Sequence, residues 1–204
     1  SSHILWINLI TDSLPALALG VDEEENKSYM DRPPRGKDES LFAGGGWGCT
    51  CFYGLLIAGI SMLAFLQGPV GTIKSAGMTL TIPHLQAVLK DAQVLARSQT
   101  YAFTVLGMAQ LFHAIGMRDV ETSVFCMNHL ENRLMLAAFA VGISLQMMVT
   151  EVPYFVQLFG TCRLTALEWT KLLLAAMPLL AHELLVLFSC AGEVKDALRL
   201  QGED

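Results

Sequence analysis

Charged residues are scarce in this chain. Only 16% of its 204 residues are Asp, Glu, Lys or Arg, whereas 53% are hydrophobic, and the mean hydropathy is +0.47. Ordinary soluble domains contain about 25% charged residues, so this composition argues against a soluble globular protein. The apolar runs leave little polar helix surface to face water. We therefore expect a membrane protein.

A basic surplus, a paired-cysteine motif and a phosphate-binding loop are also missing. The formal net charge is −6, so we expect no nucleic-acid partner. None of the five cysteines forms a CxxC pair, which argues against structural metal and disulfide chemistry. The glycine run at 44–46 has no lysine after it in the phosphate-loop pattern. These absences leave no catalytic residue and no cofactor-binding residue to predict.

Five apolar runs each approach the about 20 residues that a membrane-spanning helix needs. They lie at residues 4–20, 51–67, 99–117, 134–150 and 172–190. The sequence therefore predicts an all-α, polytopic membrane bundle of about five transmembrane helices in a lipid bilayer. Asp12 interrupts the first run and no basic segment precedes it, so this run is not a cleaved signal peptide. The alternative is a set of buried helices in a soluble all-α protein.

Basic residues divide unevenly between the two sides of this predicted bundle. If the loop at 21–50 is cytoplasmic, eight of the 13 basic residues lie inside, namely Lys27, Arg32, Arg35, Lys37, Arg118, Arg133, Lys195 and Arg199. Five lie outside, namely Lys74, Lys90, Arg97, Arg163 and Lys171. The bias predicts an outer N-terminus and a cytoplasmic C-terminus, with a long outer loop at 68–98. Because a hydrophobic helix follows Ser1 almost at once, we expect a fragment of a longer protein.

The first run carries three polar side chains at helical spacing. Asn8, Thr11 and Asp12 occupy positions i, i+3 and i+4, so they share one helix face. Pro15 has no N–H group, which frees the backbone carbonyl of Thr11. Carboxylate, amide, hydroxyl and carbonyl oxygens suit calcium or another hard cation. The spacing favours an intramembrane ion site; hydrogen bonds from Asn8 and Thr11 to a neighbouring helix, with Asp12 paired to a basic residue, are the alternative.

These residues lie in segments that closely resemble those of a known family. Residues 6–20, followed by Met-Asp-Arg-Pro-Pro-Arg at 30–35, resemble the sixth transmembrane helix and next cytoplasmic loop of P-type calcium-pumping ATPases. The resemblance continues to the eighth helix of bacterial members, the entry to the ninth and the outer loop before the tenth, at residues 102–114, 131–134 and 151–169. It implies that residues 1–204 are the C-terminal transmembrane domain of a bacterial-type P-type cation ATPase, helices six to ten.

The resemblance also implies which residues bind the transported ion. Asp12 matches the principal carboxylate, and Asn8 and Thr11 complete its oxygen shell. Gln110 matches a ligand position on the eighth helix that is Glu in the two-site reticulum-type pumps. A neutral amide there implies a single calcium ion per cycle. Interhelical hydrogen bonding is an equal alternative for Gln110, and it is the favoured reading of His113, three residues further on.

The rest of such a pump supplies what this chain lacks. The sequence contains no DKTGT phosphorylation motif, no TGE motif and no nucleotide-binding domain, so the fragment alone cannot hydrolyse ATP, and ATP and magnesium bind only in the full-length enzyme. Arg32 and Arg35 are expected to contact the phosphorylation domain. The expected cargo is calcium, with manganese or sodium as alternatives, across a bacterial plasma membrane. A non-enzymatic membrane scaffold or binding module derived from the family is the alternative from another class.

Overall fold

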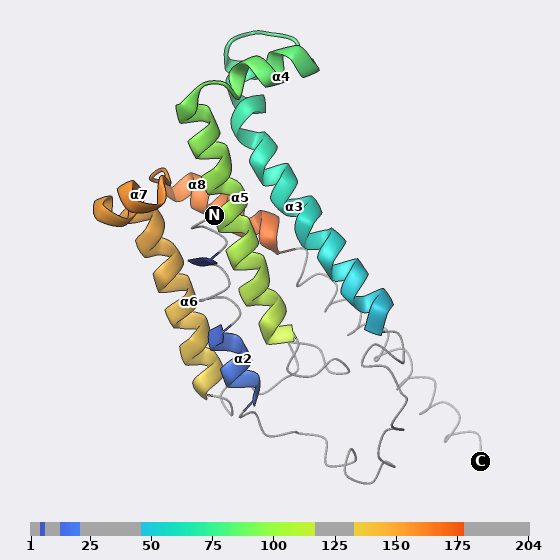
Figure 1. The fold of residues 1–204 in the computed structure, drawn as a ribbon, viewed down its shortest axis with the longest axis vertical. Coiled ribbons are helices and arrows are strands. Elements are labelled where there is room, and N and C mark those ends of the chain that lie inside the picture. Colours follow the sequence, from blue (N-terminus) through green and yellow to red (C-terminus); the bar gives the residue numbers. More distant parts are fainter. Residues whose placement is uncertain (1–4, 7–12, 21–45, 117–132, 178–204) are drawn as a thin grey trace, which may run out of the picture.

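The computed structural model describes residues 5–6, 13–20, 46–116 and 133–177. Every regular element in these ranges is an α-helix, which confirms the all-α prediction. Figure 1 shows α3, α5 and α6 as three long helices, with the short α4 joining α3 to α5. In chain order the helices are α2 (Ser13–Gly20), α3 (Gly46–Ser75), α4 (Ile82–Val88), α5 (Ala92–Gly116), α6 (Arg133–Glu151), α7 (Pro153–Phe159) and α8 (Ala166–Ala176).

The long helices differ in length, and this difference shapes one end of the bundle. With a rise of about 1.5 Å per residue, the 19 residues of α6 measure about 28 Å, close to the about 30 Å of a bilayer core. The 30 residues of α3 measure about 45 Å. The α3–α5 hairpin therefore extends beyond α6 and α7 and carries α4 at its tip (Figure 1). The predicted outer loop at 68–98 is thus largely helical.

Two of the described helices are long and apolar enough to cross a membrane, at Thr50–Ser75 and Arg133–Glu151. The whole of α5 is 25 residues long, but the polar residues Gln99, Gln110 and His113 lower its hydropathy. The predicted runs at 51–67, 99–117 and 134–150 fall on α3, α5 and α6. The runs at 4–20 and 172–190 lie partly outside the described residues, so their limits stay predictions. Most of the predicted cytoplasmic loop, with Arg32 and Arg35, also lies outside.

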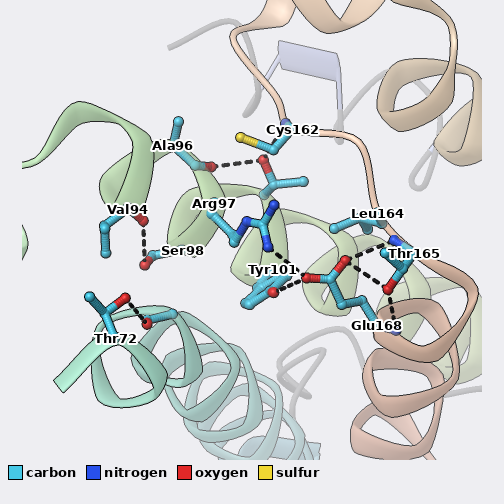
Figure 2. A network of polar contacts seen from close by, with 12 residues as sticks. Thr72, Val94, Ala96, Arg97, Ser98, Tyr101, Cys162, Leu164, Thr165 and Glu168 are labelled. Carbon is cyan, nitrogen blue, oxygen red and sulfur yellow. Dashed lines mark hydrogen bonds and ion pairs between the residues drawn. The ribbon is translucent and has the colours of Figure 1, made fainter. Parts of the chain in front are cut away.

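A single glycine allows α3 and α5 to pack closely in the projecting hairpin. A Cβ atom added to Gly68 would overlap Ser98 Oγ and would lie 3.3 Å from Ser98 Cα. Ser98 is fully buried, and its hydroxyl donates a hydrogen bond to the Val94 carbonyl, at 2.8 Å (Figure 2). Small residues at such contacts let helix backbones approach within a membrane. The hairpin therefore depends on the absence of a side chain at Gly68.

We expect Gly68→Leu to destabilise the protein, because a leucine side chain would separate α3 from α5. Overpacking of this kind costs about 1–3 kcal/mol, which lowers the midpoint of thermal unfolding by several degrees. Gly59→Leu is the matched control, since Gly59 lies on the same helix and a Cβ there meets nothing within 4 Å. Thermal unfolding of the two purified variants in one detergent compares them, and equal midpoints would contradict the proposed close packing.

The contact between α5 and α6 combines a second small residue with a buried polar pair. A Cβ on Gly142 would lie 2.7 Å from Leu111 Cδ2, so this glycine lets the leucine pack against the backbone of α6. One helical turn further along α6, Gln146 Nε2 donates to Thr104 Oγ1 at 3.4 Å, and both side chains are buried. Polar pairs of this kind hold helices together in lipid. They fix the position of α5 beside α6.

The largest hydrophobic core lies between α3, α5 and α8. It includes Ile60, Ala64, Tyr101, Val105, Met108, Leu111, Leu172 and Ala176. Other large apolar side chains of α3 remain exposed, such as Leu55 and Leu63, whose exposed fractions are 76% and 65%. A helix with apolar residues on both its packed and its exposed faces is suited to contact with lipid. The bundle thus has a packed interior and an apolar exterior.

Candidate cation site

Gln110 is the one predicted ion ligand that the structure describes. It lies on α5 and is half-buried. Phe103 and Leu106 precede it at helical spacing, so all three residues occupy one face of α5. Phe103 and Val149 form a buried cluster, against which Trp6, Leu106 and Phe159 pack. We call these five residues the Phe103 cluster; it directs the face of α5 that carries Gln110 toward the first run of the chain.

The residues on either side of the predicted ligands Asn8, Thr11 and Asp12 are described, whereas these three lie outside the described residues. On one side, Trp6 belongs to the Phe103 cluster, with its ring 4.9 Å from that of Phe159. On the other side, α2 contacts both α5 and α6.

Two residues of α2 show how it packs. Ala18 is fully buried against Met135 and Ala138 of α6. Pro15, which the sequence predicts to free a carbonyl group, lies in the first turn of the described part of α2 and is buried. Ala18 lies near the start of α6, at Met135 and Ala138, whereas Trp6 lies near its end, at Val149, so the direction from Trp6 to Ala18 is opposite to that of α6.

His113 packs against a neighbouring helix. Its ring lies 4.3 Å from the ring of Tyr53 on α3, with a tilt of 40°. This is a contact between helices, whereas the interhelical hydrogen bond that the sequence favours for His113 stays a prediction. Among the described residues no group of three or more His, Cys, Asp or Glu side chains could hold a metal ion.

A network of polar contacts, which we call the Glu168 clamp, joins α5 to the start of α8 (Figure 2). One carboxylate oxygen of Glu168 accepts hydrogen bonds from the Tyr101 hydroxyl and from Arg97 Nη1, the latter at 3.1 Å. The other accepts from the backbone N–H of Thr165 at 2.7 Å. The Thr165 hydroxyl in turn accepts from the Glu168 N–H, which completes a capping box. One side chain therefore caps α8 and fastens it to α5.

The surroundings of Glu168 favour its charged form. Burial raises the pKa of this carboxyl, but hydrogen bonds from Thr165 and Tyr101 and the charge of Arg97 outweigh burial, so the net pKa is lowered. None of these residues is among the site residues predicted from the sequence. The Thr-x-x-Glu spacing before an apolar run is a capping-box signal, so the local half of the clamp was detectable. The partners on α5, Arg97 and Tyr101, cannot be found from local spacing, because they lie about 70 residues away in the chain.

A second carboxylate fixes the segment that connects α6 to α8. Glu151 Oε1 accepts a hydrogen bond from Trp169 Nε1 at 3.0 Å. The hydroxyl of Thr161 donates to the Val149 carbonyl at 2.6 Å, and the backbone N–H of Cys162 donates to Thr100 Oγ1 at 2.9 Å. This connection therefore contacts both α5 and α6 through hydrogen bonds. It holds the α4 end of the bundle together, on the side opposite α2.

Comparison with known proteins identifies the family. The family model described as "Cation transporting ATPase, C-terminus" matches residues 1–188. The chain belongs to this family. A calcium-transporting ATPase of Bacillus cereus is 34% identical over 186 residues, which cover 91% of this chain and 20% of that protein. One from Bacillus subtilis is 36% identical over 187 residues, or 90% of this chain and 18% of that protein.

The family extends to eukaryotic relatives at lower identity. An endoplasmic reticulum-type calcium-transporting ATPase of Arabidopsis thaliana is 24% identical over 215 residues, covering 87% of this chain. The chain spans about a fifth of the length of the curated relatives that it matches. Membership of the cation-transporting ATPase family confirms the resemblance on which the sequence analysis relied, and it agrees with the apolar helices of the structure.

Proposed function

We propose that this chain is the C-terminal membrane part of an ATP-driven calcium pump in a bacterial plasma membrane, with its C-terminus in the cytoplasm. Membership of the cation-transporting ATPase family supports the pump, and the two bacterial calcium-transporting relatives support the cargo and the membrane. In this proposal the N-terminal part of the same pump binds ATP and magnesium, and Arg32 and Arg35 contact its phosphorylation domain. The chain alone carries out no ATP hydrolysis.

Within that pump, Asn8, Thr11, Asp12 and Gln110 supply part of the intramembrane calcium site. The observation that supports this proposal is the packing of Trp6 in the Phe103 cluster, because Gln110 shares the face of α5 that carries Phe103. The same contact puts the beginning of the first run beside Phe103, seven residues before Gln110 on α5. The remaining ligands come from helices outside this chain.

The depth of Gln110 in the bundle supports this arrangement. It follows Phe103 by seven residues, so it lies about 10 Å further along α5. The first run proceeds antiparallel to α6, from Trp6 at the Phe103 cluster to Ala18 near the start of α6. A helix that starts at the Phe103 cluster reaches the depth of Gln110 about seven residues after Trp6, next to Asp12. An amide on α5 and a carboxylate on the first run would then face the same ion.

The ligand chemistry matches a hard divalent cation. Carboxylate, amide and hydroxyl oxygens are the donors that Ca²⁺ takes in proteins. Asp12 brings the single negative charge of this set, and Gln110 is neutral. A second divalent ion would add two positive charges without a second carboxylate from this chain, and unpaired charge within a membrane is costly. We therefore propose one calcium ion per transport cycle.

Changing the charge at Gln110 tests its part in the site. In the full-length pump, Gln110→Glu is expected to alter calcium binding, because it adds a carboxylate beside the ion: the apparent affinity rises or a second ion is bound. Equilibrium binding of radioactive calcium measures both quantities. Gln99→Glu is the matched control, since Gln99 lies on the same helix and is exposed. Identical calcium binding by wild type, Gln110→Glu and Gln99→Glu would exclude Gln110 from the site.

A further inference from the structure

A cavity of about 690 Å³ lies between α3, α5 and α8, apart from the candidate cation site. Its polar lining comes from Gln67 on α3, Tyr101 on α5, and Glu168 and Lys171 on α8. Tyr101 and Glu168 belong to the Glu168 clamp, which lies at the level where α6 ends. If α6 spans the bilayer core, as the proposed function requires, the cavity lies where that core meets the headgroup region.

The charges at this cavity do not cancel. Glu168 is engaged by Arg97 at 3.1 Å, which neutralises its carboxylate. Lys171 is exposed and has no ion pair with any residue that the structure describes. Among the described residues, the lining thus presents the positive charge of Lys171 without an acidic partner, together with the amide of Gln67. An anionic group that accepts hydrogen bonds, such as a phosphodiester, complements this pair.

The remaining lining is apolar and accessible from the membrane. Along α8, Leu172, Leu174 and Ala175 follow the charged residues, and all three line the cavity. Leu174 is 60% exposed, so the cavity opens toward the exterior of the bundle rather than into its core. Polar residues and apolar residues that line one open cavity fit a molecule with a charged head and a hydrocarbon chain.

We propose that this cavity binds one anionic phospholipid. Its phosphodiester contacts Lys171 and the amide of Gln67, while one acyl chain lies along Leu174 and Ala175 on α8. Lysine residues near helix ends extend their amino groups toward headgroups while their methylene groups stay in apolar surroundings. The bound lipid would join α3 to α8 next to the Glu168 clamp, and so stabilise the α4 end of the bundle.

Lipid titration of the delipidated full-length pump in detergent tests this proposal. Phosphatidylglycerol and phosphatidylcholine serve as the probes, and native mass spectrometry counts the bound lipid. We expect wild type to prefer phosphatidylglycerol, and Lys171→Gln to weaken its binding about fivefold, the usual effect of one basic residue near a membrane surface. The matched control is Lys90→Gln, an exposed lysine in the turn after α4, which should keep the preference of wild type.

A second variant fills the cavity without touching its charges. Gly71 lines it, and a Cβ there meets nothing within 4 Å, so Gly71→Leu should fold normally and reduce phosphatidylglycerol binding. Soluble glycerol 3-phosphate distinguishes a lipid site from a phosphate site, because it lacks acyl chains and should not displace the lipid. The proposal is wrong if Lys171→Gln and Gly71→Leu both bind phosphatidylglycerol like wild type, or if glycerol 3-phosphate displaces it at equal concentration.

Discussion

Asp12→Asn in the full-length pump is expected to abolish calcium-dependent phosphorylation from ATP at micromolar calcium. The substitution keeps the size of the side chain but removes the negative charge that this chain brings to the proposed site. Loss of even an outer-shell partner of a metal typically costs 10–100-fold in affinity, so losing a direct carboxylate ligand should cost at least about 100-fold. Phosphorylation of purified protein by labelled ATP across a calcium series measures this shift.

The control for this experiment is an acidic residue away from the proposed site. Asp91 lies at the α4 end, immediately before α5. Its carboxylate accepts a hydrogen bond from the Gln93 N–H at 2.8 Å. Asp91→Asn retains an acceptor oxygen there and should leave calcium dependence unchanged. If Asp12→Asn is phosphorylated with the same calcium dependence as Asp91→Asn, Asp12 is not a ligand.

Glu168→Ala is expected to produce the largest loss of stability at the α4 end. It removes the capping box of α8 and leaves the Tyr101 hydroxyl and Arg97 without their acceptor. The N-cap Thr165 remains, so losing the Glu168 half of the capping box costs less than the about 1 kcal/mol of a whole cap. An unsatisfied buried donor costs about 1–3 kcal/mol, so we expect about 1–4 kcal/mol in all. The ion pair adds little, because Arg97 is 51% exposed. Thermal unfolding measures the loss.

Arg163→Ala serves as the control for Glu168→Ala. Arg163 is an exposed charged residue in the segment before α8, and within the described part of the chain it has no hydrogen bond or ion pair. Its removal should leave the unfolding midpoint within about a degree of wild type, because such surface changes are nearly neutral. Equal destabilisation by the two variants would mean that the Glu168 clamp does not hold α8 in place.

The Glu168 clamp should also make stability depend on pH. The pKa of Glu168 is lowered below its ordinary value of 4.5. Its contribution to stability is therefore complete above about pH 4.5 and is lost as the pH falls through the lowered pKa. Glu168→Gln keeps the shape of the side chain but cannot titrate, so its unfolding midpoint should change less with pH in this range. A parallel pH dependence of both proteins would contradict the assignment.

The sequence predicts the helical architecture well, because apolar runs of about 20 residues are typical of membrane-spanning helices. The runs at 51–67, 99–117 and 134–150 all fall on long helices. The apolar runs do not predict how far α3 and α5 continue beyond them. The polar residues in these extensions, such as Ser98, belong to a hairpin that is held by side-chain contacts. The close approach of Gly68 to Ser98 joins residues 30 apart and has no local signature.

The candidate site, too, is predicted only in part by the sequence. Family resemblance singles out Gln110, but it does not say which neighbours the face of α5 that carries Gln110 packs against. That face follows from Phe103, whose cluster with Val149 also includes Trp6, and this is a tertiary contact. Thr165 and Glu168 form a capping box that short-range spacing reveals. Their link to α5 again depends on tertiary packing, which no periodicity in the sequence encodes.

Equilibrium binding of radioactive calcium to the full-length pump, with wild type and Asp12→Asn side by side, tests the central claim most directly. The account predicts a single high-affinity calcium ion per wild-type molecule and no high-affinity binding by Asp12→Asn. High-affinity calcium binding by Asp12→Asn at the wild-type level, or two such ions on wild type, would contradict it.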